Sequence, residues 1–136
     1  MGISIVIGEE VLEPYTEGFI SVEVDVERRR YPINKVGDQT LDRHTNRIYF
    51  NYIGFIVFLE RCGLYDLFNN EYTGLVGTHP GACYITQKHL DTIREAKNTL
   101  KIRDEDDKNI YKDLQFFERQ FEYALKNCKV PIIINY

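Results

Sequence analysis

The sequence has no tryptophan and no apolar run of the roughly 18 residues that a membrane-spanning helix requires. Its first residues lack the basic start and the long apolar stretch of a secretory signal peptide, so we expect a cytoplasmic protein. The three cysteines are too few and too widely spaced for a disulfide framework, and their odd number suits a reducing compartment. No repeat or linker divides the 136 residues, which predicts a single domain over 1–136.

Basic residues are absent from the first 27 positions, which contain seven acidic residues, and then Arg28, Arg29 and Arg30 follow together. The whole chain contains 17 basic and 21 acidic residues. The resulting net charge of -4 disfavours non-specific binding to nucleic acid or to an anionic membrane. Specific readout of RNA or DNA is also poorly supported, because the sequence has no stripe of alternating aromatic and basic residues.

Three β-strands are predicted, two near the start of the chain and one near its end. A short buried strand covers Ile3–Ile7 and is expected to end at Gly8. In residues 20–27 apolar side chains alternate with polar and mostly acidic ones, which indicates a strand with one apolar face. The third strand, Val130–Ile134, contains a proline and is therefore predicted to lie at the edge of the sheet.

The first predicted helix is capped by Thr45 or Asn46, continues to Cys62 and ends at Gly63. Apolar residues cover most of its surface, so we expect it to be the central helix of the core. Residues 69–84, which are rich in glycine, are predicted to form a loop.

Two further helices are predicted after this loop. One begins after the cap Thr86 and continues to about Lys101, and the last follows a charged turn at 104–107. The predicted buried stripe of the last helix is Ile110, Leu114, Phe117, Phe121, Ala124 and Cys128. The elements together predict an α+β fold, with a small and mostly antiparallel sheet packed on about three helices.

The cysteines are the first candidates for catalysis. His79 precedes Cys83 by four residues, a spacing that a turn at Pro80-Gly81 could close into a Cys-His pair. Free cysteine is, however, among the most buried residue types, which favours a packing role for Cys83 and for the other two cysteines. The chain has neither a Cys-x-x-Cys pair nor a His-Glu-x-x-His helix, so we predict no metal and no cofactor.

A group of basic and aromatic residues after the second strand predicts a binding site for an anion. If that strand stays extended, Arg28 and Arg30 point to the side of its apolar residues, and Arg29 joins the acidic face. Arginine suits bidentate phosphate contacts, and tyrosine can stack on a base. The candidate ligand-binding residues are Arg28, Arg30, Tyr31, His44, Arg47 and His79.

Two stretches in the C-terminal half carry a resemblance. They are His-Pro-Gly-Ala-Cys at residues 79–83, before a threonine-capped helix, and Glu-Tyr-Ala-Leu-Lys-Asn-Cys-Lys-Val-Pro at residues 122–131. With these stretches the chain resembles small proteins of bacteria and their phages. The resemblance implies an accessory role in a bacterium or a phage, and it assigns no catalytic residue.

Three functional hypotheses follow, in this order. The first is a non-catalytic protein that binds an anionic, nucleotide-like small molecule through the six residues named above. The second is an acidic immunity-type or inhibitor-type protein whose residues 9–27 contact a basic protein partner. The third is a small hydrolase that uses His44 or His79 as a general base. We expect neither a membrane nor a specific nucleic acid as partner, and the composition leaves a homo-oligomer open.

Overall fold

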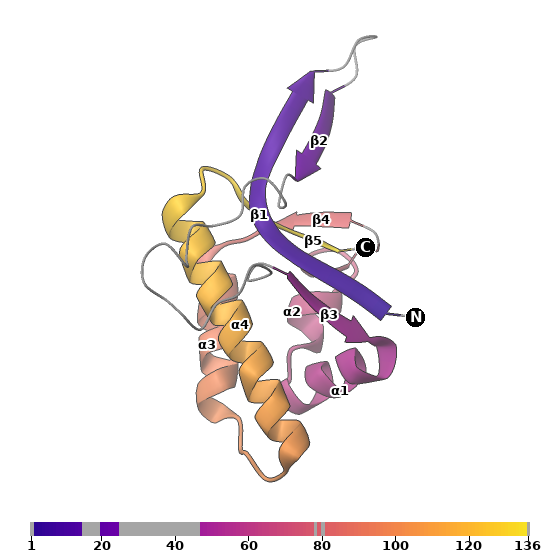
Figure 1. The fold of residues 1–136 in the computed structure, drawn as a ribbon, viewed down its shortest axis with the longest axis vertical. Helices are drawn as coiled ribbons and strands as arrows, with labels where there is room; N and C mark the ends of the chain where they lie inside the picture. Colours follow the sequence, from indigo (N-terminus) through magenta and orange to yellow (C-terminus); the bar gives the residue numbers. More distant parts are fainter. Residues whose placement is uncertain (1, 15–19, 25–46, 78, 80, 136) are drawn as a thin grey trace.

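The computed structural model describes residues 2–14, 20–24, 47–77, 79 and 81–135, with side chains placed from residue 47 onward within these ranges and in residues 2–8. The elements follow in the order β1 (Gly2–Pro14), β2 (Ile20–Val24), β3 (Arg47–Asn51), α1 (Tyr52–Cys62), α2 (Tyr65–Asn69), β4 (Gly81–Tyr84), α3 (Gln87–Thr99), α4 (Glu105–Asn127) and β5 (Pro131–Asn135) (Figure 1). The predicted α+β fold with an antiparallel sheet is confirmed, and the described residues form four helices rather than three. Within these ranges, no helix has both the length and the apolar character needed to cross a membrane.

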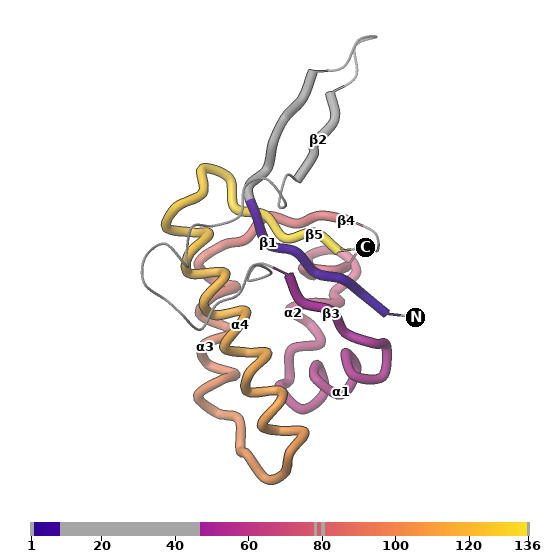
Figure 2. The backbone as a smooth tube through the Cα atoms, in the orientation of Figure 1, coloured from indigo at the N-terminus to yellow at the C-terminus, as the bar shows by residue number. Residues whose placement is uncertain are grey.

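Strand β1 holds the sheet together. Its first residues pair antiparallel with β3, where Ile3 lies opposite Phe50, and its middle pairs antiparallel with β5, where Ile7 lies opposite Ile133. β5 pairs in turn with β4, and the last part of β1 forms a ladder with β2. The first and last strands in the sequence therefore lie side by side within the sheet (Figure 2).

Three predictions about the strands are wrong in detail. β1 does not end at Gly8, which is buried and pairs with β5 opposite Ile132. β5 is not an edge strand, because it lies between β1 and β4. Its proline is tolerated because Pro131 is the first residue of the strand, where its carbonyl accepts the Ile85 N–H at 3.0 Å. Finally, the segment predicted as a loop contains β4.

The strand predicted in residues 20–27 is confirmed as β2 over Ile20–Val24. Its ladder with β1 places Glu23 opposite Val11 and Ser21 opposite Glu13. The side chains of β2 lie outside those that the structure describes, so the apolar face of this strand stays a prediction. Arg28 and Arg30 also lie outside the described residues.

The first predicted helix begins later than expected. Residues Arg47–Asn51 form β3 instead, and the cap of α1 is Asn51, whose Oδ1 accepts the Gly54 N–H at 2.6 Å. The aromatic and β-branched residues of this segment suit a strand, and pairing with β1 outweighs the helical period. The predicted caps, Thr45 and Asn46, lie outside the described residues. The predicted end is confirmed, since Gly63 adopts the left-handed conformation with φ of 67°.

The helix α3 begins at the predicted place, whereas α4 begins earlier than predicted, because residues 105–107 of the predicted turn already form its first turn. Thr86 caps α3, where its hydroxyl accepts the His89 N–H at 3.4 Å and its own N–H donates to His89 Nδ1 at 3.0 Å. Asp104 caps α4 by accepting the Asp107 N–H at 2.9 Å. The sequence did not indicate that the buried Asp107 would also bind Arg61 of α1, at 2.9 Å. The Arg61 hydrogen bond is the main cause that lowers the pKa of Asp107, so this ion pair joins α1 to α4 at neutral pH.

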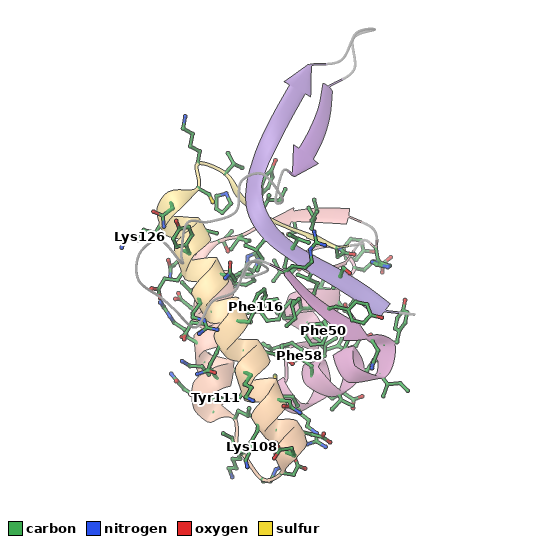
Figure 3. The ribbon with its side chains drawn as sticks, viewed as in Figure 1. Phe50, Phe58, Lys108, Tyr111, Phe116 and Lys126 are labelled. Carbon is green, nitrogen blue, oxygen red and sulfur yellow. The ribbon has the colours of Figure 1, made fainter. Side chains whose placement is uncertain are left out.

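The core lies between α4, α1 and the sheet, and phenylalanine rings fill its centre (Figure 3). The predicted stripe of α4 is confirmed at five of its six positions, because only Cys128 is half-buried rather than buried. α4, and not α1, is the most buried helix. Although α1 is apolar on nearly every side, it buries only Phe55, Phe58 and Leu59 and exposes Tyr52, Ile53 and Ile56.

Asp113 on α4 is half-buried, and burial raises its pKa to about 6. A carboxyl with a raised pKa favours folding in its protonated form, so its stabilising contribution is present below pH 4 and is lost as the pH rises through about 6. We expect Asp113→Asn to remove this loss and to be more stable than the parent protein at pH 7.5 by about 1 to 2 kcal/mol, a value reduced for partial exposure. Urea unfolding of both proteins at pH 4, 6 and 7.5 measures the difference. An advantage of the variant that does not grow with pH would contradict the assignment.

Candidate functional site

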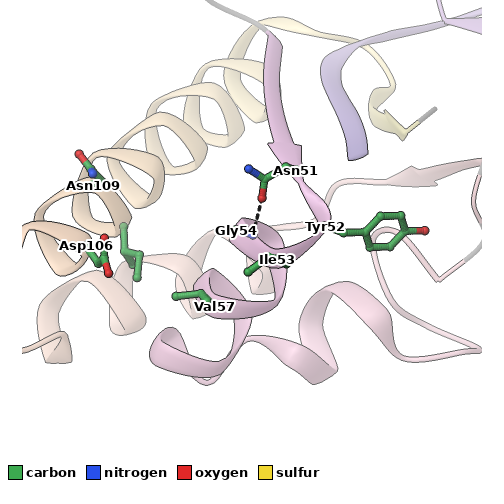
Figure 4. A pocket seen from close by; sticks show the side chains of 8 residues that line it. Asn51, Tyr52, Ile53, Gly54, Val57, Asp106 and Asn109 are labelled. Carbon is green, nitrogen blue, oxygen red and sulfur yellow. Dashed lines mark hydrogen bonds between the residues drawn. The ribbon is translucent and has the colours of Figure 1, made fainter. Parts of the chain in front are cut away.

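Two cavities open beside α1, and Tyr52 lines both of them. The larger one, about 680 Å³, lies between the first turns of α1 and α4 (Figure 4). The smaller one, about 480 Å³, lies between α1, α2 and the start of β1, and we call it the α1–α2 cavity. Both volumes fall in the range of about 300 to 1,000 Å³ that is typical of small-molecule sites.

Two of the polar side chains that line the larger cavity are already engaged. Asn51 is already engaged as the cap of α1, through its hydrogen bond to the Gly54 N–H (Figure 4). Asp106 lies 3.8 Å from Nη2 of Arg61. The Tyr52 ring points away from Asp106, so it does not add its hydroxyl to that wall (Figure 4).

The α1–α2 cavity combines an apolar floor with a polar and aromatic rim. Ile3, Phe55 and Val76 are buried and form the floor. The remaining lining residues are Tyr52, Ile56, Glu60, Tyr65, Asn69 and His79. This combination of a buried apolar base and a few convergent polar groups is typical of a ligand site.

The helical period explains how the rim is assembled. Tyr52, Ile56 and Glu60 are four residues apart on α1, so they lie along one face of that helix. Tyr65 and Asn69 have the same spacing on α2, which begins directly after the turn at Gly63. Two short stripes from consecutive helices therefore line the same cavity.

His79 reaches the cavity from the segment before β4, and Asn135 of β5 positions it. His79 Nδ1 lies 2.5 Å from Asn135 Oδ1, and Asn135 Nδ2 donates to the Gly81 carbonyl at 3.4 Å. Because the second bond directs the amide oxygen of Asn135 towards the imidazole, His79 donates its Nδ1–H. In the neutral ring, Nε2 is then an acceptor.

Of the six predicted ligand-binding residues, His79 alone lines a cavity described here. Arg47 is half-buried at the first position of β3, and it lines neither cavity. The five residues of β3 span about 13 Å, and it is the Asn51 end that meets α1. Arg28, Arg30, Tyr31 and His44 lie outside the described residues, so their contribution stays a prediction.

The cysteines show the features of packing residues. Cys62, Cys83 and Cys128 are half-buried and contact the core cluster. Burial, together with Asp113, raises the pKa of Cys62 to about 12, and burial also raises the pKa of Cys83. Both groups are therefore thiols at neutral pH, and a thiol is a poor nucleophile. Across the described ranges, no three His, Cys, Asp or Glu side chains are grouped to hold a metal ion.

Glu60, Tyr65 and Asn69 were not predicted from the sequence. A signal did exist, because α1 is too apolar for a helix that must leave one side in water. Aromatic and aliphatic residues that stay exposed on such a helix indicate a binding surface. Comparison of the chain with family models, with curated proteins and with solved structures found no match. The chemistry of the α1–α2 cavity is therefore the main guide to function.

Proposed function

We propose that the chain is a non-catalytic binding protein that holds a small molecule in the α1–α2 cavity. The observation that carries this proposal is the convergence of Glu60, Tyr65 and His79, from three separate segments, on one cavity of about 480 Å³ with an apolar floor. Such a site buries much of a small ligand and orients it through a few polar contacts. The resemblance to bacterial and phage proteins adds that the role is an accessory one.

The chemistry of the described residues favours binding over hydrolysis. His79 donates to the neutral amide of Asn135, whereas a catalytic histidine usually donates to a carboxylate that stabilises its protonated form. The thiols of Cys62 and Cys83 have raised pKa values and are not activated nucleophiles. His44 lies outside the described residues, so a hydrolase that uses it stays a prediction.

Binding of an anionic, nucleotide-like ligand would depend on the arginine cluster, which is Arg28, Arg29 and Arg30. We expect Arg28→Ala or Arg30→Ala to weaken nucleotide binding about ten- to a hundredfold, because each removes one charge-assisted contact, and Arg29→Ala to do much less. Calorimetric titration of the three variants with a nucleotide panel measures this contrast. Equal losses at the three positions would contradict it, since a generic basic patch makes no such distinction.

A second candidate is a protein-interaction role. The ladder between β1 and β2 contains Glu10, Glu13 and Glu23 and thus gathers part of the acidic segment on adjacent strands. An acidic ladder of this kind suits a basic partner, whose association would weaken steeply with added salt.

Titration of the 15N-labelled protein with single compounds tests the binding proposal. The probes are adenosine, indole and choline, which represent a nucleoside, a neutral ring and a cation. We expect at least one of them to shift the amide signals of residues 52–65 and of His79. Tyr65→Ala should weaken that binding at least tenfold, because it removes one wall of the cavity.

Tyr72→Ala is the matched control, since Tyr72 is 89% exposed and does not line the cavity. If none of the three probes shifts these signals, or if both tyrosine variants weaken binding equally, the α1–α2 cavity is not the binding site.

A further inference from the structure

We infer that the α1–α2 cavity selects a cationic group, either a protonated amine or a quaternary ammonium, and holds it against Glu60 and the exposed ring of Tyr65. This inference rests on the proposed binding function and names the class of ligand for the same site. It concerns the described cavity, and it differs in charge from the ligand that the arginine cluster would take.

The charge of the lining is the first reason. Glu60 is the one carboxylate among the described lining residues, and no lysine or arginine lines the cavity with it. Some carboxylates of this protein have close partners, such as Glu118 with Lys97 at 2.6 Å and Asp107 with Arg61 at 2.9 Å, and others, such as Glu71 and Glu95, form no ion pair among the described residues. Within the part of the chain that the structure describes, no ion pair involves Glu60. Glu60 is exposed at the rim of the cavity, and its negative charge attracts a positively charged ligand there.

The aromatic rings are the second reason. Tyr52 and Tyr65 are 50% and 59% exposed, and both line the cavity. Phe55 in the floor packs on Phe58 and Phe68, with ring centroids 6.4 and 5.9 Å away. Neither tyrosine, by contrast, stacks on another ring of the described residues. Their electron-rich faces therefore remain available to a cation, and quaternary ammonium groups are commonly bound by such rings.

The hydrogen-bonding character of the rim is the third reason. Glu60 can only accept hydrogen bonds when ionised, and His79 offers an accepting Nε2 because Asn135 takes its Nδ1–H. Both groups suit a ligand that carries N–H or O–H donors. A phosphate, which accepts hydrogen bonds and is negatively charged, would be repelled by Glu60.

The length of the cavity sets the shape of the ligand. Glu60 and Tyr52 are eight residues apart on α1, a separation of about 12 Å along the helix. The buried side chains of Phe55 and Val76 lie in the floor. A suitable ligand therefore has its positive charge at the Glu60 end and a short apolar body.

Choline and 3,3-dimethylbutan-1-ol test the inference, because they have the same shape and differ in the charge of the head group. In titrations of the full chain followed by amide signals, we expect choline to bind at least tenfold more tightly than the alcohol. Glu60→Gln should weaken choline binding about tenfold and leave the weak binding of the alcohol unchanged. Glu95→Gln is the matched control, since Glu95 is an exposed residue of α3 that lines no cavity described here, and it should change neither.

A second pair of variants distinguishes the loss of the Tyr65 aromatic ring from a loss of fold stability. Tyr65→Phe keeps an aromatic face and should retain choline binding, whereas Tyr65→Leu should lose it while both variants keep the melting temperature of the parent protein. Equal affinity for choline and the alcohol, or equal effects of the two glutamate variants, would overturn the inference. If adenosine or indole binds in the cavity and choline does not, the inference fails and the binding proposal stands. If none of the probes binds, both fail.

Discussion

Phe117→Ala is expected to lower the free energy of unfolding by about 3 to 5 kcal/mol. The side chain of Phe117 is fully buried, and its ring lies with centroid distances of 5.2 Å from Phe68, 5.7 Å from Phe121 and 5.8 Å from Phe58. Alanine would leave a cavity bordered by these rings, whose rigid shapes cannot collapse into it. Urea unfolding followed by far-ultraviolet circular dichroism measures the loss, because the chain has no tryptophan for fluorescence.

Phe116→Ala is the matched control for this prediction. Phe116 is the next residue of α4 and is only half-buried, so we expect it to cost about 1 to 2 kcal/mol. Phe55→Ala and Phe121→Ala remove buried rings of the same cluster and should resemble Phe117→Ala. Losses below about 1 kcal/mol at these three buried positions would show that the ring cluster does not stabilise the fold.

Gln120→Met, unlike Phe117→Ala, is expected to stabilise the protein and to raise the free energy of unfolding by about 1 to 3 kcal/mol. Gln120 lies on α4 with no exposed surface, and neither Nε2 nor Oε1 has a hydrogen-bond partner among the described residues. Folding therefore removes the amide from water without replacing its hydrogen bonds, and this is unfavourable. Methionine has a similar length and fills the same space without that cost.

The same unfolding experiment tests this prediction, with Gln115→Met as the control. Gln115 is on the same helix but half-buried, so its change should stay within about 0.5 kcal/mol. A Gln120→Met protein that is less stable than the parent would mean that the amide is satisfied in solution.

The sequence predicted the elements whose signals are local. α4 was predicted because its buried stripe repeats at the helical period and because acidic residues at 104–107 suit the N-terminal end of a helix, although the helix begins within them. Gly63 was predicted because a left-handed residue at a helix end favours glycine. β3 was missed because its residues fit a helical stripe, and the competing interaction is with β1, far away in the sequence. The interior place of β5 depends in the same way on partners that no local pattern reveals.

Only a small part of the candidate site was predicted, because its assembly also depends on contacts between residues far apart in the sequence. His79 was named from its residue type, and it does line a cavity. Glu60 and Tyr65 were missed because the helical period shows which residues share a face, and it does not show which face stays uncovered. That depends on how α1, α2 and β1 come together, a result of tertiary packing.

The position of β1 also determines the order in which the protein can fold. Ile7 pairs with Ile133, so β1 is synthesised long before the residues of β5 that pair with its middle. Contacts with so large a sequence separation give a high contact order, which slows folding relative to helical proteins of similar size. During that delay the apolar strand has an open edge, a template for pairing with other chains. Loss of the last nine residues, 128–136, would remove β5, and β1 and β4 would then have no shared neighbour in the sheet.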